Sequence, residues 1–139
     1  MTDKITIAGH VHQLAIPSSF LATVDPVSVR NDSANIAEFH LAAGNWLVQV
    51  KAHAKTVGDG TQGAAVNLIL GIAGTLDRLD ISFGHVTSSA PYATLTPMIG
   101  IRSSVTTHVL LRASAQGEAL IEAIVIAGTK HDELLLLQM

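Results

Sequence analysis

The chain has 139 residues and a mass of 14.5 kDa, with 48% hydrophobic residues, 14% charged residues, 4% aromatic residues and no cysteine. This length predicts one domain that needs no disulfides, and the missing cysteine excludes disulfide scaffolds, zinc ribbons and thiol chemistry. The net charge of −3 argues against nucleic-acid binding, which needs clustered basic residues. No apolar stretch long enough for a transmembrane helix and no signal peptide are visible, so neither a membrane nor secretion is expected.

The charged fraction is low, because soluble domains typically carry about 25% charged residues, and the mean hydropathy is +0.42. A small monomer of this composition has too few charged groups to cover its surface. We therefore expect part of the surface to be buried against other copies of the chain, in a homo-oligomer, or against a larger assembly.

Alternation of apolar and polar residues is the main structural signal. It is clearest from Trp46 to Thr56, where every second residue is apolar and most residues between are polar. A period of two predicts a half-buried strand and not a helix. Similar segments recur about every ten residues between turn residues, which is typical of an antiparallel sandwich or barrel. The predicted strands are residues 5–8, 11–16, 20–24, 36–41, 46–57, 65–72, 78–83, 93–101, 105–114 and 119–127.

Two of these segments, 64–73 and 118–126, also have a composition that a helix accepts. Glycines bound both, and both are only as long as a strand, so strands are predicted. In the second segment alternation places five apolar residues on one face, which predicts a strand at the centre of a sandwich or between subunits. These five are Ala119, Ile121, Ala123, Val125 and Ala127.

Four consecutive leucines follow near the end of the chain, at 134–137. Leucines in solvent are unfavourable, so this run is expected to pack on the domain or on a neighbouring subunit. Together with the late apolar strand it forms the predicted subunit interface. Its residues are Leu120, Ile121, Val125, Leu134, Leu135, Leu136 and Leu137.

A longer pattern connects several of the predicted strands. The stretch Phe39–Val50 (FHLAAGNWLVQV) is followed by a loop, by Val66–Leu70 and by the late apolar strand. This order resembles the jelly-roll domains of the complement-globular-head and tumour-necrosis-factor type, over roughly residues 36–127. In this chain Leu, Ile and Ala replace most of the rings that line the inter-subunit face of that family.

The resemblance implies an all-β protein, an antiparallel β-sandwich of jelly-roll type, that assembles as a homotrimer. Similar domains are common among bacteriophage head-decoration, fibre and spike proteins. We expect residues 36–139 to form the sandwich and residues 1–35 to form N-terminal strands or an arm, within a single domain overall.

The sequence offers few residues for chemistry. Gly58–Gly63 fits G-x-G-x-x-G, but an alternating strand precedes it where a nucleotide site needs a buried parallel strand, so a hairpin loop is expected. His10 and His12 would share one face of a strand, as two ligands of a metal would, but no third ligand is evident. Asp77 and Asp80 are three residues apart, which places them on opposite faces of a strand and predicts structural roles.

The sequence therefore predicts a protein that acts by packing and not an enzyme, with no cofactor and no metal. The leading hypothesis is a virion structural protein of a bacteriophage, a capsid decoration, cement or fibre-like module that contacts itself and a capsid or tail protein. The alternative is a lectin-like or receptor-like jelly-roll module that binds a carbohydrate or a peptide. A third hypothesis, a small metal-dependent enzyme, depends on His10 and His12 alone.

Overall fold

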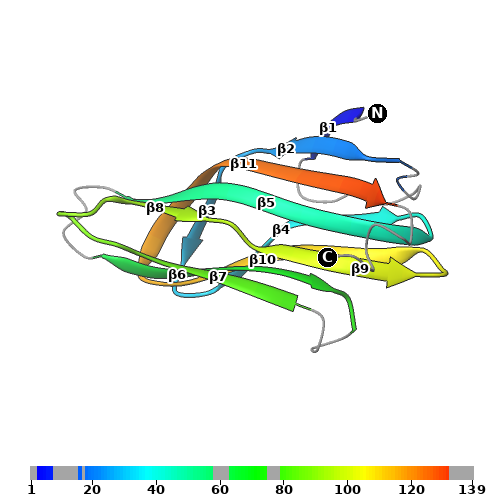
Figure 1. Ribbon diagram of the computed structural model, residues 1–139. Coiled ribbons are helices and arrows are strands. Elements are labelled where there is room, and N and C mark those ends of the chain that lie inside the picture. The colour runs from blue at the N-terminus through cyan, green and yellow to red at the C-terminus, as the bar shows by residue number, and fades with distance from the viewer. Residues whose placement is uncertain (1–2, 8–15, 17, 58–62, 75–78, 132–139) are drawn as a thin grey trace.

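The computed structural model describes residues 3–7, 16, 18–57, 63–74 and 79–131, and these form two β-sheets packed face to face (Figure 1). None of the described residues is helical, so no helix among them crosses a membrane. The larger sheet contains β1 (Asp3–Ile7), β2 (Phe20–Val24), β3 (Val27–Arg30), β5 (Gly44–Thr56), β8 (Tyr92–Leu95), β9 (Met98–Ser103) and β11 (Glu118–His131). The smaller sheet contains β4 (Ser33–Leu41), β6 (Ala64–Ile72), β7 (Leu79–Val86) and β10 (Thr107–Gln116).

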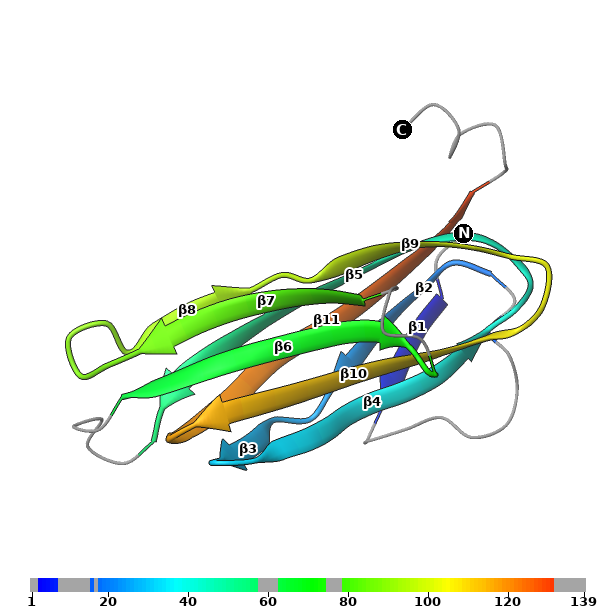
Figure 2. The same cartoon turned by 90° about the horizontal axis from the view of Figure 1, so that it is seen from below.

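The strand pairings are nested, which defines the topology. β6 pairs with β7, β5 with β8 and β9, β4 with β10, and β2 with β11, so each outer pair encloses the inner ones in the sequence. Nested pairs of this kind form one long antiparallel hairpin, which is folded over so that successive pairs lie alternately in the two sheets. Figure 2 shows β7, β6, β10 and β4 side by side in front of the larger sheet. The predicted antiparallel β-sandwich of jelly-roll type is confirmed, and only the β1–β2 pair among the named strands is parallel.

The core lies between the two sheets and is mainly aliphatic. Three rings are fully buried in it: Phe20 lies 5.5 Å from Phe39 and 6.2 Å from Trp46, measured between ring centroids. The indole Nε1 of Trp46 donates a hydrogen bond of 2.9 Å to the carbonyl of Ala42, which satisfies its one polar group. The alternation from Trp46 onward therefore marks the inward face of β5.

A β-bulge changes which residues of β11 face the core. The pairing with β5 shifts between Glu122 and Val125, and Ala123 has a φ of 52°. Before the bulge Ile121 points inward, whereas after it Ile124 does. The interpretation of 119, 121, 123, 125 and 127 as one apolar face is therefore wrong, because one extra residue reverses the alternation.

Several strand boundaries also differ from the prediction. The strand predicted at 93–101 is divided into β8 and β9, because Pro97 lies between them and has no N–H for a ladder. Strand β3 is additional to the predicted strands and has only four residues. Both β2 and β3 pair with β11 and so belong to the larger sheet, whereas residues 33–35 begin β4 of the smaller sheet. Residues 11–15 lie outside the described part of the chain.

Side chains of β7 tie the two sheets together at one edge of the sandwich. Asp80 Oδ2 accepts a hydrogen bond of 2.8 Å from the N–H of Met98, and Ser82 Oγ accepts one of 3.0 Å from the N–H of Thr96. Both donors lie where Pro97 interrupts the ladder of the larger sheet. The carboxylate of Asp80 therefore has a structural role at this edge.

Replacing Asp80 should loosen this edge. We expect Asp80→Ala to lower the free energy of unfolding by about 1–2 kcal/mol, since it removes a hydrogen bond to a charged acceptor. Urea denaturation of the two proteins measures this. Asp80→Asn, which keeps an acceptor, should recover most of the loss, and equal losses in the two variants would contradict this role.

Candidate functional site

The outer face of the smaller sheet carries the most distinctive surface of the described chain. Its strand register places residues from β4, β10, β6 and β7 in rows across the sheet. One row contains polar side chains and ends in an aromatic ring: Ser33, Ser114, Asn67 and Phe83. The next row contains Asn35, Arg112, Ile69 and Ile81, so the face becomes apolar toward β7.

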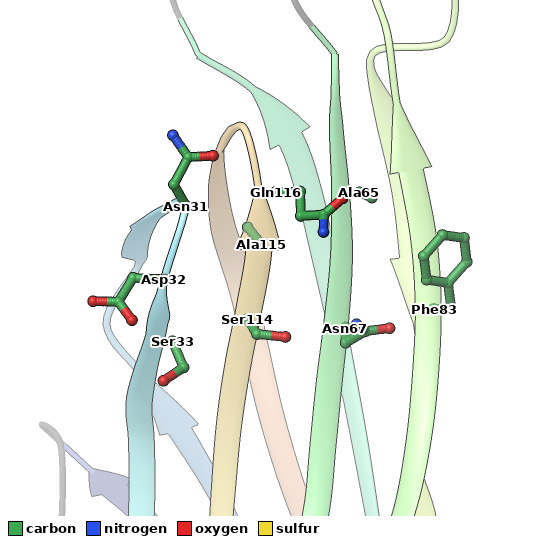
Figure 3. Close-up of a pocket in the computed structure, with 9 residues that line it drawn as sticks. All are labelled: Asn31, Asp32, Ser33, Ala65, Asn67, Phe83, Ser114, Ala115 and Gln116. Atoms are coloured by element: carbon green, nitrogen blue, oxygen red, sulfur yellow. The ribbon is translucent and has the colours of Figure 1, made fainter.

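The polar end of this face forms an open groove of about 540 Å³, shown in Figure 3. We call it the polar groove. Asn67 and Phe83 are direct partners in the β6–β7 register, and in Figure 3 the Asn67 amide points toward the Phe83 ring. The Phe83 side chain is 64% exposed. The residues that line the groove are Asn31, Asp32, Ser33, Ala65, Asn67, Phe83, Ser114, Ala115 and Gln116.

Some of these polar groups are used within the fold. Asn31 Oδ1 accepts a hydrogen bond of 2.7 Å from the N–H of Gly117, which fixes the turn between β10 and β11. Ser33 Oγ accepts a 3.4 Å hydrogen bond from Arg112. The side chains of Asn67 and Gln116, in contrast, make no hydrogen bond to another described residue. Their amides are therefore available to a ligand.

The other end of the face forms a second groove, of about 350 Å³, which we call the apolar groove. Ile69, Leu79 and Leu110 line it, and Ile81 stands beside Ile69 with 51% of its surface exposed. An exposed cluster of large aliphatic side chains is unusual on a soluble domain and is typical of a contact surface.

A pair of histidines lies beyond the apolar groove on the same face. His40 and His108 are cross-strand partners whose rings stack with centroids 4.4 Å apart and planes 8° apart. His108 Nε2 lies 2.6 Å from Glu38 Oε1. The sequence placed these residues in separate segments as isolated surface groups, and only the β4–β10 pairing brings them together. Within the described residues, no group of three or more possible ligands is arranged to hold a metal ion.

The outer face of the larger sheet is more polar. Lys55 Nζ lies 2.9 Å from Glu122 Oε1, and the hydrogen bond and charge of this carboxylate raise the pKa of Lys55 above its usual 10.5. The contribution of this pair to stability is thus present at neutral pH and is lost as the pH rises through the raised lysine pKa. His53 Nδ1 lies 3.4 Å from Thr94 Oγ1 on the neighbouring strand.

The residues predicted to form a subunit interface are separated by the fold. Ile121 is fully buried in the core of its own domain, so its burial needs no neighbouring subunit. Leu120 and Val125 are half-buried and lie on the outer face of the larger sheet, opposite Lys55 and Lys51 in the register. Leu134, Leu135, Leu136 and Leu137 lie outside the described residues. The interface itself stays a prediction.

The remaining candidate residues are placed as follows. The predicted hairpin loop at Gly58–Gly63 is wrong, because β5 before it lies in the larger sheet and β6 after it lies in the smaller one. A strand follows this connection where the nucleotide motif requires a helix. Residues 58–62 themselves, Asp77, His10 and His12 lie outside the described part of the chain.

Comparisons with known proteins show similarity in fold. Structures of infectious bursal disease virus, Gx and Gt strains, match with TM-scores of 0.62 and 0.52 at 11% and 9% identity, over 83% and 81% of this chain. Each match spans only 33% of the viral chain, so the similarity covers about a third of the matched proteins. The CBM22-1 xylan-binding domain of Paenibacillus barcinonensis Xyn10C matches with a TM-score of 0.45 at 14% identity, over 68% of this chain and 64% of that one.

No family model matches the chain, and no curated protein matches it. The similar structures thus include viral proteins and a xylan-binding domain. At these identities the similarity establishes the fold that the strand pairings already define.

Sequence reasoning missed both grooves. Ser33, Asn67, Phe83 and Ser114 lie on four strands that are far apart in the chain, so no motif joins them. One signal was available in β7, which has large apolar residues at the alternate positions 79, 81 and 83. These positions are on the exposed face of an edge strand, where polar residues are usual, so they indicate a contact surface.

Proposed function

We propose that this protein is a structural component of a virus particle that acts by oligomeric packing. The observation that supports the proposal is the apolar groove, which Leu79 lines, together with the exposed Ile81 beside it on the same sheet face. The low charged fraction of the chain agrees with a surface that is partly covered in an assembly. The fold similarity to proteins of a virus particle is consistent with this role.

The occupant of the apolar groove in this proposal is a second copy of the chain. Burying aliphatic surface stabilises an assembly by about 25 cal/mol per Å², less the free energy lost when two molecules associate. We propose more specifically a homotrimer that serves as a bacteriophage capsid decoration, cement or fibre-like module, located in the virion. A capsid or tail protein of the particle would be its further partner.

The alternative is a lectin-like or receptor-like module that binds a ligand. The polar groove favours this alternative, because it combines unused amides with an exposed aromatic ring. The two functions use opposite ends of one sheet face, so they can coexist in one protein.

The assembly is tested by sedimentation equilibrium at micromolar concentration. We expect the unaltered chain to be oligomeric and Ile81→Lys to shift it toward the monomer, because an ammonium group cannot be buried unpaired in an aliphatic contact.

Met98→Lys is the matched control, since Met98 is also 51% exposed but lies on the larger sheet. It should leave the oligomer intact. A stable monomer of the unaltered chain would overturn the proposed assembly. Dissociation by Met98→Lys and not by Ile81→Lys would contradict the use of the apolar groove.

A further inference from the structure

We propose that the polar groove binds a neutral carbohydrate, with one sugar ring stacked on Phe83 and its hydroxyls bonded by Asn67 and Gln116. This inference deepens the ligand-binding alternative above and does not depend on assembly. The volume of the polar groove, about 540 Å³, is within the usual range of roughly 300–1,000 Å³ for small-molecule sites.

The hydrogen-bonding groups of the groove match sugar hydroxyls. A hydroxyl both donates and accepts, and a side-chain amide offers a donor and an acceptor side by side. Asn67 and Gln116 are such amides, and neither bonds to another described residue. Ser114 lies opposite Asn67 in the β10–β6 register and adds a hydroxyl to the same row. The row can therefore bond several hydroxyls of one ligand without rearranging the fold.

Phe83 supplies the apolar part of the site. The face of a sugar ring is formed largely by C–H groups, which pack well on the electron-rich face of an aromatic ring. Three of the five aromatic rings of the chain, those of Phe20, Phe39 and Trp46, are fully buried, whereas Phe83 is 64% exposed directly beside the free Asn67 amide. Figure 3 shows the ring at one margin of the groove, with polar side chains following across β6, β10 and β4.

The charge of the groove favours a neutral ligand. Asp32 is the one charged residue among those lining it, and in Figure 3 its carboxylate points away from β10. Without clustered basic residues the groove does not match nucleic acids or sulfated sugars. The groove lies over paired strands, so it offers a peptide few free backbone groups for strand addition.

The row also has the length for a short oligosaccharide. Neighbouring strands lie about 4.8 Å apart, so the four side chains from β4 to β7 span about 14 Å. The sugar on Phe83 would be the anchor, and further units would extend across the sheet toward Ser33.

The test begins with the unaltered protein on an array of neutral oligosaccharides, including cello-, xylo- and galacto-oligosaccharides, with sialylated and sulfated glycans for comparison. Calorimetric titration with the strongest neutral oligosaccharide then gives the dissociation constant. We expect Phe83→Ala to weaken binding about tenfold or more and Phe83→Trp to retain it, because the stacking surface is lost in one and kept in the other. Asn67→Ala should weaken binding severalfold.

Tyr92→Ala is the matched control, since Tyr92 is 67% exposed on the larger sheet, away from the groove. It should leave the dissociation constant unchanged, and thermal melting should show that all variants fold. No binding to any neutral oligosaccharide at millimolar concentration, binding of charged glycans alone, or equal losses with Tyr92→Ala and Phe83→Ala would overturn the proposal. Sedimentation of the same samples reports assembly separately, so failure of one function is distinguished from failure of the other.

Discussion

Gly128→Ala should destabilise the protein by about 3 kcal/mol, the upper part of the range for overpacking a core. Gly128 lies on β11 between Phe20 of β2 and Val48 of β5 in the sheet register. A methyl group at this position would lie within 2.9 Å of three ring carbons of Phe20. The ring cannot move aside easily, because it packs against Phe39 and Trp46. Urea or thermal denaturation measures the loss.

Gly100→Ala is the matched control for this change. Gly100 lies on β9 in the same sheet, and a methyl group there would meet nothing within 4 Å. We expect a change within about 0.5 kcal/mol, with a small gain possible because alanine restricts the unfolded chain. Combining Gly128→Ala with Phe20→Leu should cost less than the sum of the two single changes, since the smaller side chain makes room for the methyl group. Equal effects of the two glycine substitutions would contradict the close approach of β11 and Phe20.

Ile121→Ala should lower the free energy of unfolding by about 2–4 kcal/mol, through lost contacts and the cavity left behind. Ile121 is fully buried between the two sheets, before the bulge reverses the alternation of β11. Its contribution belongs to the single domain. We therefore expect the loss to be the same at low and high protein concentration, which denaturation at several concentrations measures.

Leu120→Ala is the comparison for this change, because Leu120 is its neighbour on the outer face and is half-buried. We expect a loss below about 1 kcal/mol in the single domain. If Leu120 also forms a subunit contact, as the sequence predicts, its loss will grow with protein concentration. A larger effect of Leu120→Ala than of Ile121→Ala at low concentration would show that the inward face of this strand is assigned incorrectly.

The nested pairings also explain why the functional surface was not visible in the sequence. Chain neighbours such as β5 and β6 lie in different sheets, whereas distant strands such as β4 and β10 lie side by side. A face of the smaller sheet therefore collects residues from four separate parts of the chain. The polar groove, the apolar groove and the stacked pair of His40 and His108 all arise in this way.

The amino-acid sequence by itself determined the class of fold and the general character of the surface. Period-two alternation is a local property of each segment, and the Trp46 strand shows it because one of its faces is buried along its whole length. The segments 64–72 and 118–126, whose composition suits a helix, lie in strands as predicted, and the second strand continues through Gly128 to His131. The low charge, likewise, is a count that needs no structure.

Only the tertiary structure decided which side chains meet. The bulge at Glu122 and Ala123 depends on the pairing of β11 with β5. Simple alternation predicts Val125 on the same face as Ile121, whereas in the structure the two side chains lie on opposite faces. The row from Ser33 to Phe83 depends on the register of three strand pairs. Register is set by packing between distant segments, and one residue of slip turns a core position into a surface position. The shortage of charge is visible in the sequence, but the place where the surface is apolar is fixed by the fold.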